Sequence, residues 1–321
     1  MFAKLFSRQT EPVPQPQPSP APPKMQGNGL IRVNLKTLIN LAQSATAIKL
    51  RINSPRALQS GGYVSRFKGR GMEFDEARLY QPGDDIRRID WKVTARTSAP
   101  HTKIFREERE RPIFIAVDNR PAMHFATRGV FKAVQAAKLA ALIAWAAQQQ
   151  GDRIGGQLFS HAQCQELKPQ NGKHGVLRLL NMLVNAPDAN TDTPGSTSIS
   201  FDHALSRLLQ HARPGSRVYL ISDFRGFNAA AEQHLSKLAR HCDVVLIMVY
   251  DPLEANLPAK GRYRFADAER DVLIDTGDSK RLARYHDRFS THLHHIEQFA
   301  QKSAMHFLTC DTLCDPLSRL R

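Results

Sequence analysis

The chain has 321 residues, of which 41% are hydrophobic, and this length accommodates one large domain with a smaller accessory part. Its formal net charge of +15 at pH 7 favours an anionic partner: nucleic acid, an acidic membrane surface or an acidic protein. The four cysteines lack a zinc-ligand spacing and require no disulfide, which argues against a zinc module and a disulfide scaffold. No apolar stretch approaches the about twenty residues that span a bilayer, which argues against a membrane-spanning chain.

The first 60 residues are predicted to hold a tail and one helix. Seven prolines between positions 12 and 23 predict an extended, disordered tail over residues 1–26. An N-terminal helical region is expected over residues 27–60, because apolar residues recur at helical spacing from 35 to 48. Asn34 is suited to cap the first turn of this helix.

Residues 61–111 are predicted to form a small β-rich accessory region, with strands at 61–67 and 103–110. Within it, the run GRGMEFDEARLYQPGDDIRRIDWKVTAR at 69–96 combines charges of both signs, aromatic residues and turn-forming glycines. The YQPGDD portion predicts a tight turn, because proline presets one backbone angle and glycine permits the next. Two roles suit this segment better than a catalytic centre: a structural clasp or a partner-binding surface.

The candidate residues of this segment are charged or aromatic. They are Arg78, Tyr80, Asp84, Asp85, Arg87, Arg88, Asp90, Trp91 and Arg96. We expect the acidic residues to pair with the arginines in a network. We also expect the ring of Trp91 to be buried, anchoring the segment against the main domain.

Residues 112–321 are predicted to form an α/β domain. Continuous apolar runs typical of buried strands lie at 113–117, 153–159, 217–221 and 244–250. Helical patterns alternate with them at 128–149, 172–183, 201–211 and 228–240. A hairpin over 262–274, a helix over 280–302 and a strand at 306–309 follow. This alternation predicts a doubly wound, mostly parallel sheet covered by helices on both faces.

The signature run, together with its continuation TSAPHTKIFREERERPIFIAVDNRPAMHF, resembles the domain-of-unknown-function family fifty-eight. That family joins such a segment to a von Willebrand factor A-like domain, so the resemblance implies this fold for residues 112–321. Proteins similar to this family are commonly paired with MoxR-type AAA+ ATPases. The resemblance therefore implies an adaptor or chaperone-accessory role in the maturation or assembly of other proteins.

Aspartates end or follow three of the predicted strands: Asp118, Asp223 and Asp251. In doubly wound sheets the functional groups gather at the carboxyl ends of the strands. The same positions also suit aspartates that only cap a helix or shape a turn.

The resemblance implies a metal-ion-dependent adhesion site at this edge, with the pattern Asp-x-Ser-x-Ser, a threonine and a further aspartate, which suits a hard cation. Asp118, Thr197 and Asp223 match that pattern. Arg120 and Ala122 stand where the two serines should be. Because alanine has no ligand atom and a guanidinium pairs with carboxylates instead, we expect a degenerate site without metal.

These observations predict a non-enzymatic interaction protein without a cofactor, located in the cytoplasm, including the inner face of the membrane. The implied partner is a MoxR-type AAA+ ATPase; an acidic membrane surface or a client protein is a further option. One alternative is a nucleic-acid-binding protein, which the charge favours but the scattered basic residues do not. The other alternative is a metal-dependent hydrolase that uses Asp118 and Asp223.

Overall fold

The computed structural model describes residues 29–50, 72–107, 112–187, 199–258, 261–266 and 271–321. The tail predicted over residues 1–26, the strand predicted at 61–67 and the candidate ligand Thr197 all lie outside this part of the chain.

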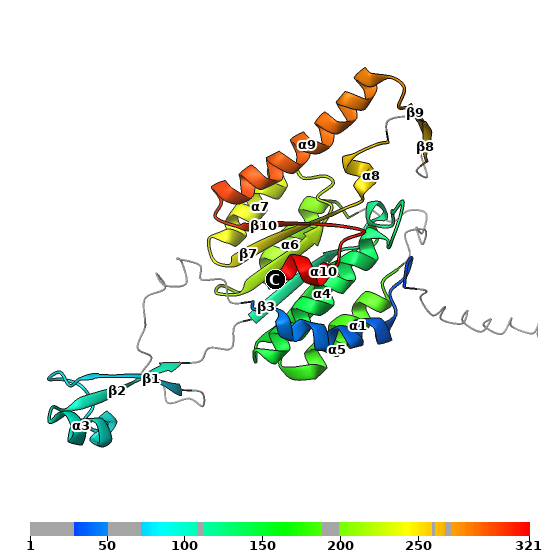
Figure 1. The fold of residues 1–321 in the computed structure, drawn as a ribbon. Helices are drawn as coiled ribbons and strands as arrows, with labels where there is room; N and C mark the ends of the chain where they lie inside the picture. Colours follow the sequence, from blue (N-terminus) through cyan, green and yellow to red (C-terminus); the bar gives the residue numbers. More distant parts are fainter. Residues whose placement is uncertain (1–28, 51–71, 108–111, 188–198, 259–260, 267–270) are drawn as a thin grey trace, which may run out of the picture.

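A six-stranded sheet forms the centre of the main domain (Figure 1). Its strands are β3 (Pro112–Asp118), β4 (Arg153–Phe159), β5 (Cys164–Gln170), β6 (Arg217–Ser222), β7 (Asp243–Tyr250) and β10 (His306–Asp311). They lie in the order β10-β7-β6-β3-β4-β5, and every neighbouring pair is parallel except β4 with β5. The inner strands are continuous apolar runs because both of their faces are covered. The predicted doubly wound, mostly parallel α/β architecture is confirmed.

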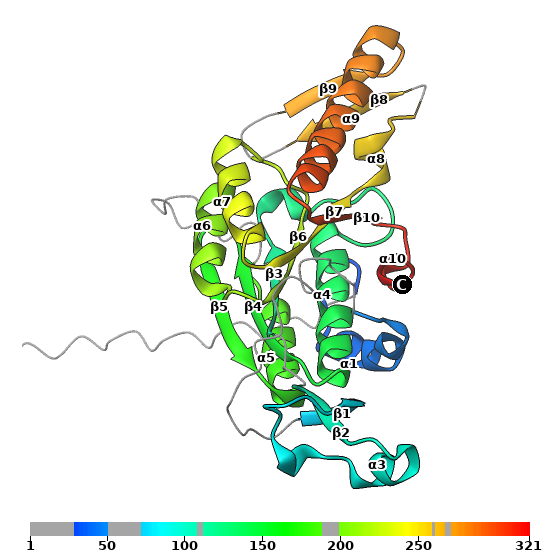
Figure 2. The ribbon, with the colours of Figure 1, turned by 90° about the vertical axis from the view of Figure 1, so that its left-hand side faces the viewer.

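Helices cover the sheet on both faces, as Figures 1 and 2 show from two directions. The first face carries α1 (Leu35–Ser44), α4 (Lys132–Gln149), α5 (Gly172–Val184) and α10 (Pro316–Leu320). The second face carries α6 (Phe201–His211), α7 (Ala229–Ala239) and the long α9 (Ser279–Lys302). Two separate apolar cores result, one on each side of the sheet.

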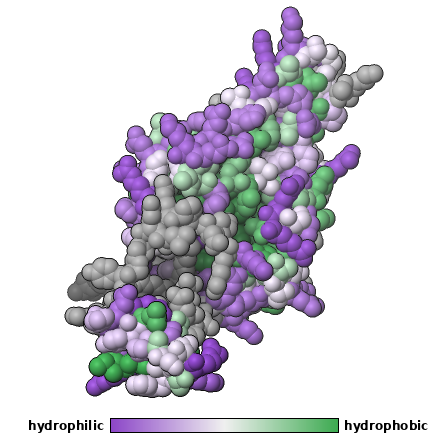
Figure 3. All heavy atoms as spheres, turned by 60° about the vertical axis from the view of Figure 1, so that its left-hand side comes forward, coloured by the Kyte–Doolittle hydropathy of each residue, from purple (hydrophilic) through white to green (hydrophobic). Residues whose placement is uncertain are grey.

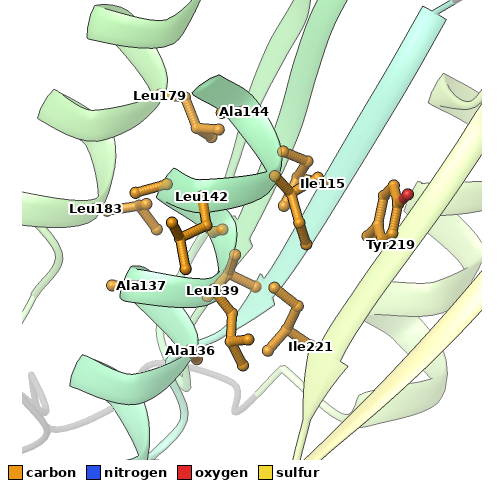
Figure 4. Packing of buried hydrophobic residues seen from close by; sticks show 14 of the residues in the cluster. Ile115, Ala136, Ala137, Leu139, Leu142, Ala144, Leu179, Leu183, Tyr219 and Ile221 are labelled. Atoms are coloured by element: carbon orange, nitrogen blue, oxygen red, sulfur yellow. The ribbon is translucent and has the colours of Figure 1, made fainter. Parts of the chain in front are cut away.

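Helix α4 is the central helix of the first core, and 14 of its 18 residues are buried. In Figure 4 its Leu139 lies near Ile221 of β6 and its Leu142 lies beside Leu183 of α5, and Ile115 of β3 belongs to the same cluster. The many alanines of α4 let the sheet, α1 and α5 all approach closely. A helix that is apolar nearly all round is a buried helix, and α4 takes that position.

Helix α1 begins as predicted, because the Asn34 side chain accepts a hydrogen bond from the Lys36 amide at 2.9 Å. It is shorter than the region 27–60 proposed for it, since it ends at Ser44 and is followed by a short 3-10 helix. The indole of Trp145 on α4 donates to the Leu38 carbonyl at 3.0 Å and so holds α1 against the main domain.

A small unit precedes the main domain and lies outside the helices that cover the sheet (Figures 1 and 2). Its strands β1 (Met72–Leu79) and β2 (His101–Glu107) pair antiparallel, with a bulge between Phe74 and Glu76. Between them lie the 3-10 helix η2 (Ile86–Arg88) and the helix α3 (Trp91–Thr97). The accessory region thus contains a helix that the prediction of strands and loops omitted.

The remaining predicted elements are present. Strands β8 (Arg262–Ala266) and β9 (Asp271–Asp275) form the expected hairpin, and α9 and β10 follow it. Strand β5, the one-turn helix α8 (Pro252–Ala255) and α10 were not predicted, because each is short or carries mixed polarity. In the part of the chain that the structure describes, no helix combines the length and the apolar character that crossing a membrane demands.

Candidate functional site

The three strand-end aspartates lie at the same edge of the sheet, the edge formed by the carboxyl ends of the parallel strands. Asp118 is the last residue of β3, Asp223 follows β6 and Asp251 follows β7, and these three strands are neighbours. The exposed fraction of Asp118 is 0% and that of Asp223 is 4%. Two carboxylates removed from water need close partners, so the surrounding contacts decide what this edge can do.

Asp118 is held by Arg120 and Ser222. The Arg120 guanidinium donates to both carboxylate oxygens, from Nε to Oδ1 at 3.0 Å and from Nη2 to Oδ2 at 2.7 Å. The Arg120 amide also donates to Oδ1 at 2.9 Å, and the Ser222 hydroxyl donates to Oδ2 at 2.6 Å. The pairing of Arg120 with Asp118 expected from the sequence is present, and it is bidentate.

Two aromatic rings hold the Arg120 guanidinium in place. Its central carbon lies 4.8 Å from the ring centroid of Phe201 and 5.8 Å from that of Phe159. Nη2 also approaches Asp223 Oδ1 at 3.8 Å, so one cation faces the carboxylates of two strands. The planar guanidinium suits this position, because it can stack on a ring and bond a carboxylate in the same plane.

Lys132 supplies a second internal cation at the same edge. Its side chain is fully buried, and its ammonium donates to Asp223 Oδ2 at 3.0 Å and to Glu254 Oε1 at 2.9 Å. Arg225, which is exposed, pairs with Glu254 at 2.9 Å and approaches Asp223 at 3.5 Å. Lys132 was not among the residues singled out from the sequence. Its one signal was a lysine in the first turn of a mostly apolar helix.

The three carboxylates of this cluster face three cations. They are Asp118, Asp223 and Glu254 on one side and Arg120, Lys132 and Arg225 on the other. Burial disfavours the charge of Asp223, but Lys132 and Arg225 outweigh it, and the pKa of this carboxyl is lowered. Burial raises the pKa of Asp118, and the adjacent charge of Arg120 opposes this rise. For the guanidinium of Arg120, the attraction of Asp118 outweighs burial and raises the pKa.

Asp251 has a structural position in this edge. It caps α8 together with Glu254 in a reciprocal pair of hydrogen bonds. It also accepts from the Thr127 hydroxyl at 2.6 Å and from the Thr312 hydroxyl at 2.9 Å. Asp251 therefore joins the loops before α4 and after β10 to the end of β7.

These residues do not fit the divalent cation that the fold family implies. Both oxygens of Asp118 already accept hydrogen bonds from Arg120, and Ala122 offers no ligand atom. A cation between Asp118 and Asp223 would meet the guanidinium of Arg120 at close range. Hard divalent cations need several free oxygen ligands, but the carboxylate oxygens of Asp118 and Asp223 already bind the side chains of Arg120 and Lys132.

The signature segment is organised mainly by its aspartates. Asp84 pairs with Arg78 at 2.7 Å and accepts the Gln81 amide at 3.0 Å, closing the predicted turn. Gly83 in this turn has φ of 106°, a conformation that favours glycine. Asp85 caps η2 and Asp90 caps α3 through backbone amides.

The predicted ion-pair network is therefore largely wrong. Of the proposed pairings only Arg78 with Asp84 forms, and Asp90 instead approaches Lys103 at 3.9 Å. Arg87, Arg88 and Arg96 have no carboxylate partner among the residues that the structure describes, and Tyr80 is half-buried. The aspartates bond backbone amides because an amide two or three residues along the chain is the nearer donor.

The expected burial of Trp91 is also wrong. The exposed fraction of this residue is 68%, and no residue of α3 is buried. Trp91 is the first residue of α3 and directly follows the cap Asp90. An exposed ring does not support the clasp role assigned to Trp91.

Comparison with known proteins identifies a family for most of the chain. The profile of a family described as "Protein of unknown function DUF58" matches residues 76–295. The uncharacterized proteins Rv1480 of Mycobacterium tuberculosis and Mb1516 of Mycobacterium bovis are each 33% identical over 213 residues, which is 66% of this chain and 66% of theirs.

Solved structures with a similar fold are more distant. The hypothetical protein BatB of Bacteroides thetaiotaomicron gives a TM-score of 0.41 at 14% identity, covering 63% of this chain and 90% of that one. An aerotolerance-related membrane protein of Bacteroides fragilis gives 0.44 at 13% identity, covering 65% and 94%. A von Willebrand factor type A protein of Catenulispora acidiphila gives 0.34 at 11% identity, covering 47% and 35%.

Proposed function

The chain belongs to the DUF58 family, and we propose that it is a non-enzymatic adaptor that binds a protein partner. The partner proposed is a MoxR-type AAA+ ATPase, and the process is the maturation or assembly of other proteins. The choice of partner rests on the resemblance of the signature segment. The proposed location is the cytoplasm, where the positive charge also favours the inner face of the membrane.

The observation that carries the proposal is the state of the sheet edge. Catalysis or metal binding there would need a carboxylate oxygen free to reach a substrate, a water molecule or a cation. The carboxylate oxygens of Asp118 and Asp223 instead accept hydrogen bonds from Arg120 and Lys132 inside the protein. An edge neutralised in this way supports the fold, which favours a function carried by surface contacts.

A hydrolase that uses Asp118 and Asp223 is the weaker candidate for the same reason. A nucleic-acid-binding protein is favoured by net charge alone, and net charge is an argument about non-specific association. A hydrolase centred on the sheet edge also leaves the exposed Trp91 without a role.

The test is direct binding between the purified full chain and a purified MoxR-type ATPase from the same organism. Titration calorimetry without nucleotide, with ADP and with a slowly hydrolysed ATP analogue covers the states of the ATPase. We expect a dissociation constant of about 0.1–10 μM in at least one state, the range of a transient protein interface. Heat at the level of buffer dilution in all three states would reject the proposed partner and, with it, the adaptor function as proposed.

A further inference from the structure

The small unit exposes its large apolar side chains. Of the side chains that the structure describes between residues 77 and 103, Thr102 alone is buried. Leu79, Ile86 and Trp91 have exposed fractions of 60%, 64% and 68%. The space-filling view in Figure 3 shows apolar atoms on the surface of this unit, at the lower left. Side chains of this kind, displayed on a unit that buries so few of its own, are typical of an interaction surface.

The same stretch displays positive charge without a matching negative charge. Residues 77–103 contain six lysines and arginines against three aspartates, Asp84, Asp85 and Asp90. All three aspartates are engaged within the unit, as turn and helix caps. The exposed cations that face no carboxylate among the described residues are Arg87, Arg88, Lys92 and Arg96.

The backbone that carries these side chains is fixed by local hydrogen bonds. Asp90 accepts two amides in the first turn of α3, and the helix ends at Thr97, followed by its cap Ser98 in the left-handed conformation with φ of 58°. The Thr94 hydroxyl accepts the His101 amide at 3.0 Å, which joins α3 to β2. A surface held in one conformation before binding loses less conformational entropy when a partner covers it.

We propose that η2 and α3 form a docking surface for an acidic patch on a partner protein, a surface we call the Trp91 surface. It consists of Ile86, Arg87, Arg88, Trp91, Lys92 and Arg96. This inference rests on the proposed adaptor function and assigns the residues that carry it. Tryptophan and arginine are the residues that most often dominate the energy of protein interfaces, and here they lie within two adjacent short helices.

Charge and residue type select this occupant over the others. A second copy of the chain would bring another net charge of +15 against the same cations. A nucleic acid would match the cations and stack on Trp91, but it would leave exposed Ile86 without an apolar contact. An acidic protein patch with an apolar centre satisfies both the cations and the apolar side chains.

The experiment measures binding of full-length variants to the purified MoxR-type ATPase in its binding-competent nucleotide state. Arg87→Glu/Arg88→Glu reverses two cations of the surface, and Trp91→Ala removes its aromatic side chain. The matched controls lie in the main domain: Lys173→Glu/Arg178→Glu on α5 makes the same change in charge, and Leu313→Ala truncates another exposed apolar residue. Thermal melts verify that every variant is folded.

We expect each variant of the Trp91 surface to weaken binding by about 30-fold, and each control by less than about 3-fold. Binding of the unmodified chain should also weaken as salt rises. If the unmodified chain binds but all four variants bind equally well, the Trp91 surface is wrong and the adaptor function stands. If the unmodified chain does not bind the ATPase in any nucleotide state, the adaptor proposal fails, and this inference fails with it.

Two further probes decide among the occupants. Random-sequence duplex DNA and vesicles containing phosphatidylserine are titrated with the same variants. One outcome would overturn the protein partner and assign the surface to phosphate groups. In that outcome the chain binds either probe more tightly than it binds the ATPase, and this binding is lost in the Arg87→Glu/Arg88→Glu variant but kept in its α5 control.

Discussion

The two tryptophans of the chain lie in opposite surroundings. Trp145, with an exposed fraction of 6%, is enclosed by α4 and α1 and donates its indole hydrogen to a backbone carbonyl. Trp91, at 68%, stands at the start of α3 among cations. The charges follow the same division. Lys132 in the main domain is buried and paired, whereas Arg87 in the small unit is exposed and has no carboxylate partner among the described residues.

This difference separates residues that stabilise the fold from residues that are exposed and available to a partner. In the main domain Trp145 and Lys132 are buried and have partners within the chain, so their removal should harm the fold. In the small unit Trp91 and Arg87 are exposed, so under our proposal their removal should harm binding instead.

The largest expected effect comes from Lys132. Lys132→Met leaves Asp223 and Glu254 without their buried counter-charge, and we expect the free energy of unfolding to fall by about 3–5 kcal/mol. Urea denaturation measures it, with Lys173→Met on α5 as the exposed control. A loss below about 1 kcal/mol would show that the ammonium of Lys132 does not hold these carboxylates.

The two tryptophans provide the second test. Trp145→Ala should lower the free energy of unfolding by about 3–5 kcal/mol, because it opens a cavity in the core and removes the bond to α1. Trp91→Ala should change it by less than about 0.5 kcal/mol, since the ring is exposed. Comparable losses in the two variants would mean that Trp91 is covered, which would restore the clasp.

Arg120 provides the third test. Arg120→Ala should lower the free energy of unfolding by about 3 kcal/mol, because Asp118 loses its bidentate partner. Thermal melts of the unmodified protein should not respond to millimolar Mg²⁺, since a ligand stabilises only the state that binds it.

The variant Arg120→Ser/Ala122→Ser restores two hydroxyl groups at the positions of the resembled metal site. Its melting temperature should rise with Mg²⁺ and should not respond to the same concentration of Na⁺. A Mg²⁺-dependent shift in the unmodified protein would return this edge to the metal-binding class.

The smallest expected effect concerns pH and Asp251. The hydroxyl and amide donors around this carboxyl outweigh its burial and lower its pKa below the ordinary value of 3.8. The stabilisation is therefore present above about pH 4 and is lost as pH falls through the lower folded-state value. Asp251→Asn should be less stable at neutral pH and should lose less stability than the unmodified protein between about pH 5 and pH 3, measured by urea denaturation. Parallel pH profiles for the two proteins would contradict this.

Much of the fold could be predicted because buried parallel strands are continuous apolar runs, as β6 and β7 are. The edge strand β5 could not, since its mixed polarity resembles a loop. Helix α3 was missed because a seven-residue helix that buries nothing has no apolar periodicity.

For the site, the contacts that could be predicted are those between residues close together in the sequence. Asp118 and Arg120 are two residues apart, so their pairing could be inferred from the sequence. Lys132 lies 91 residues from Asp223 and 122 from Glu254, and only the sheet order brings them together. Asp85 and Asp90 were expected to bind arginines, but the nearest amides competed successfully for them.

The claim that the small unit, and not the sheet edge, receives the partner is tested most directly by hydrogen–deuterium exchange of the full chain with and without the MoxR-type ATPase. The account predicts that binding slows amide exchange across η2 and α3, residues 86–97, and leaves residues 119–127 and 223–227 at the sheet edge unchanged. Slowed exchange at 119–127 and 223–227, with residues 86–97 unchanged, would contradict it.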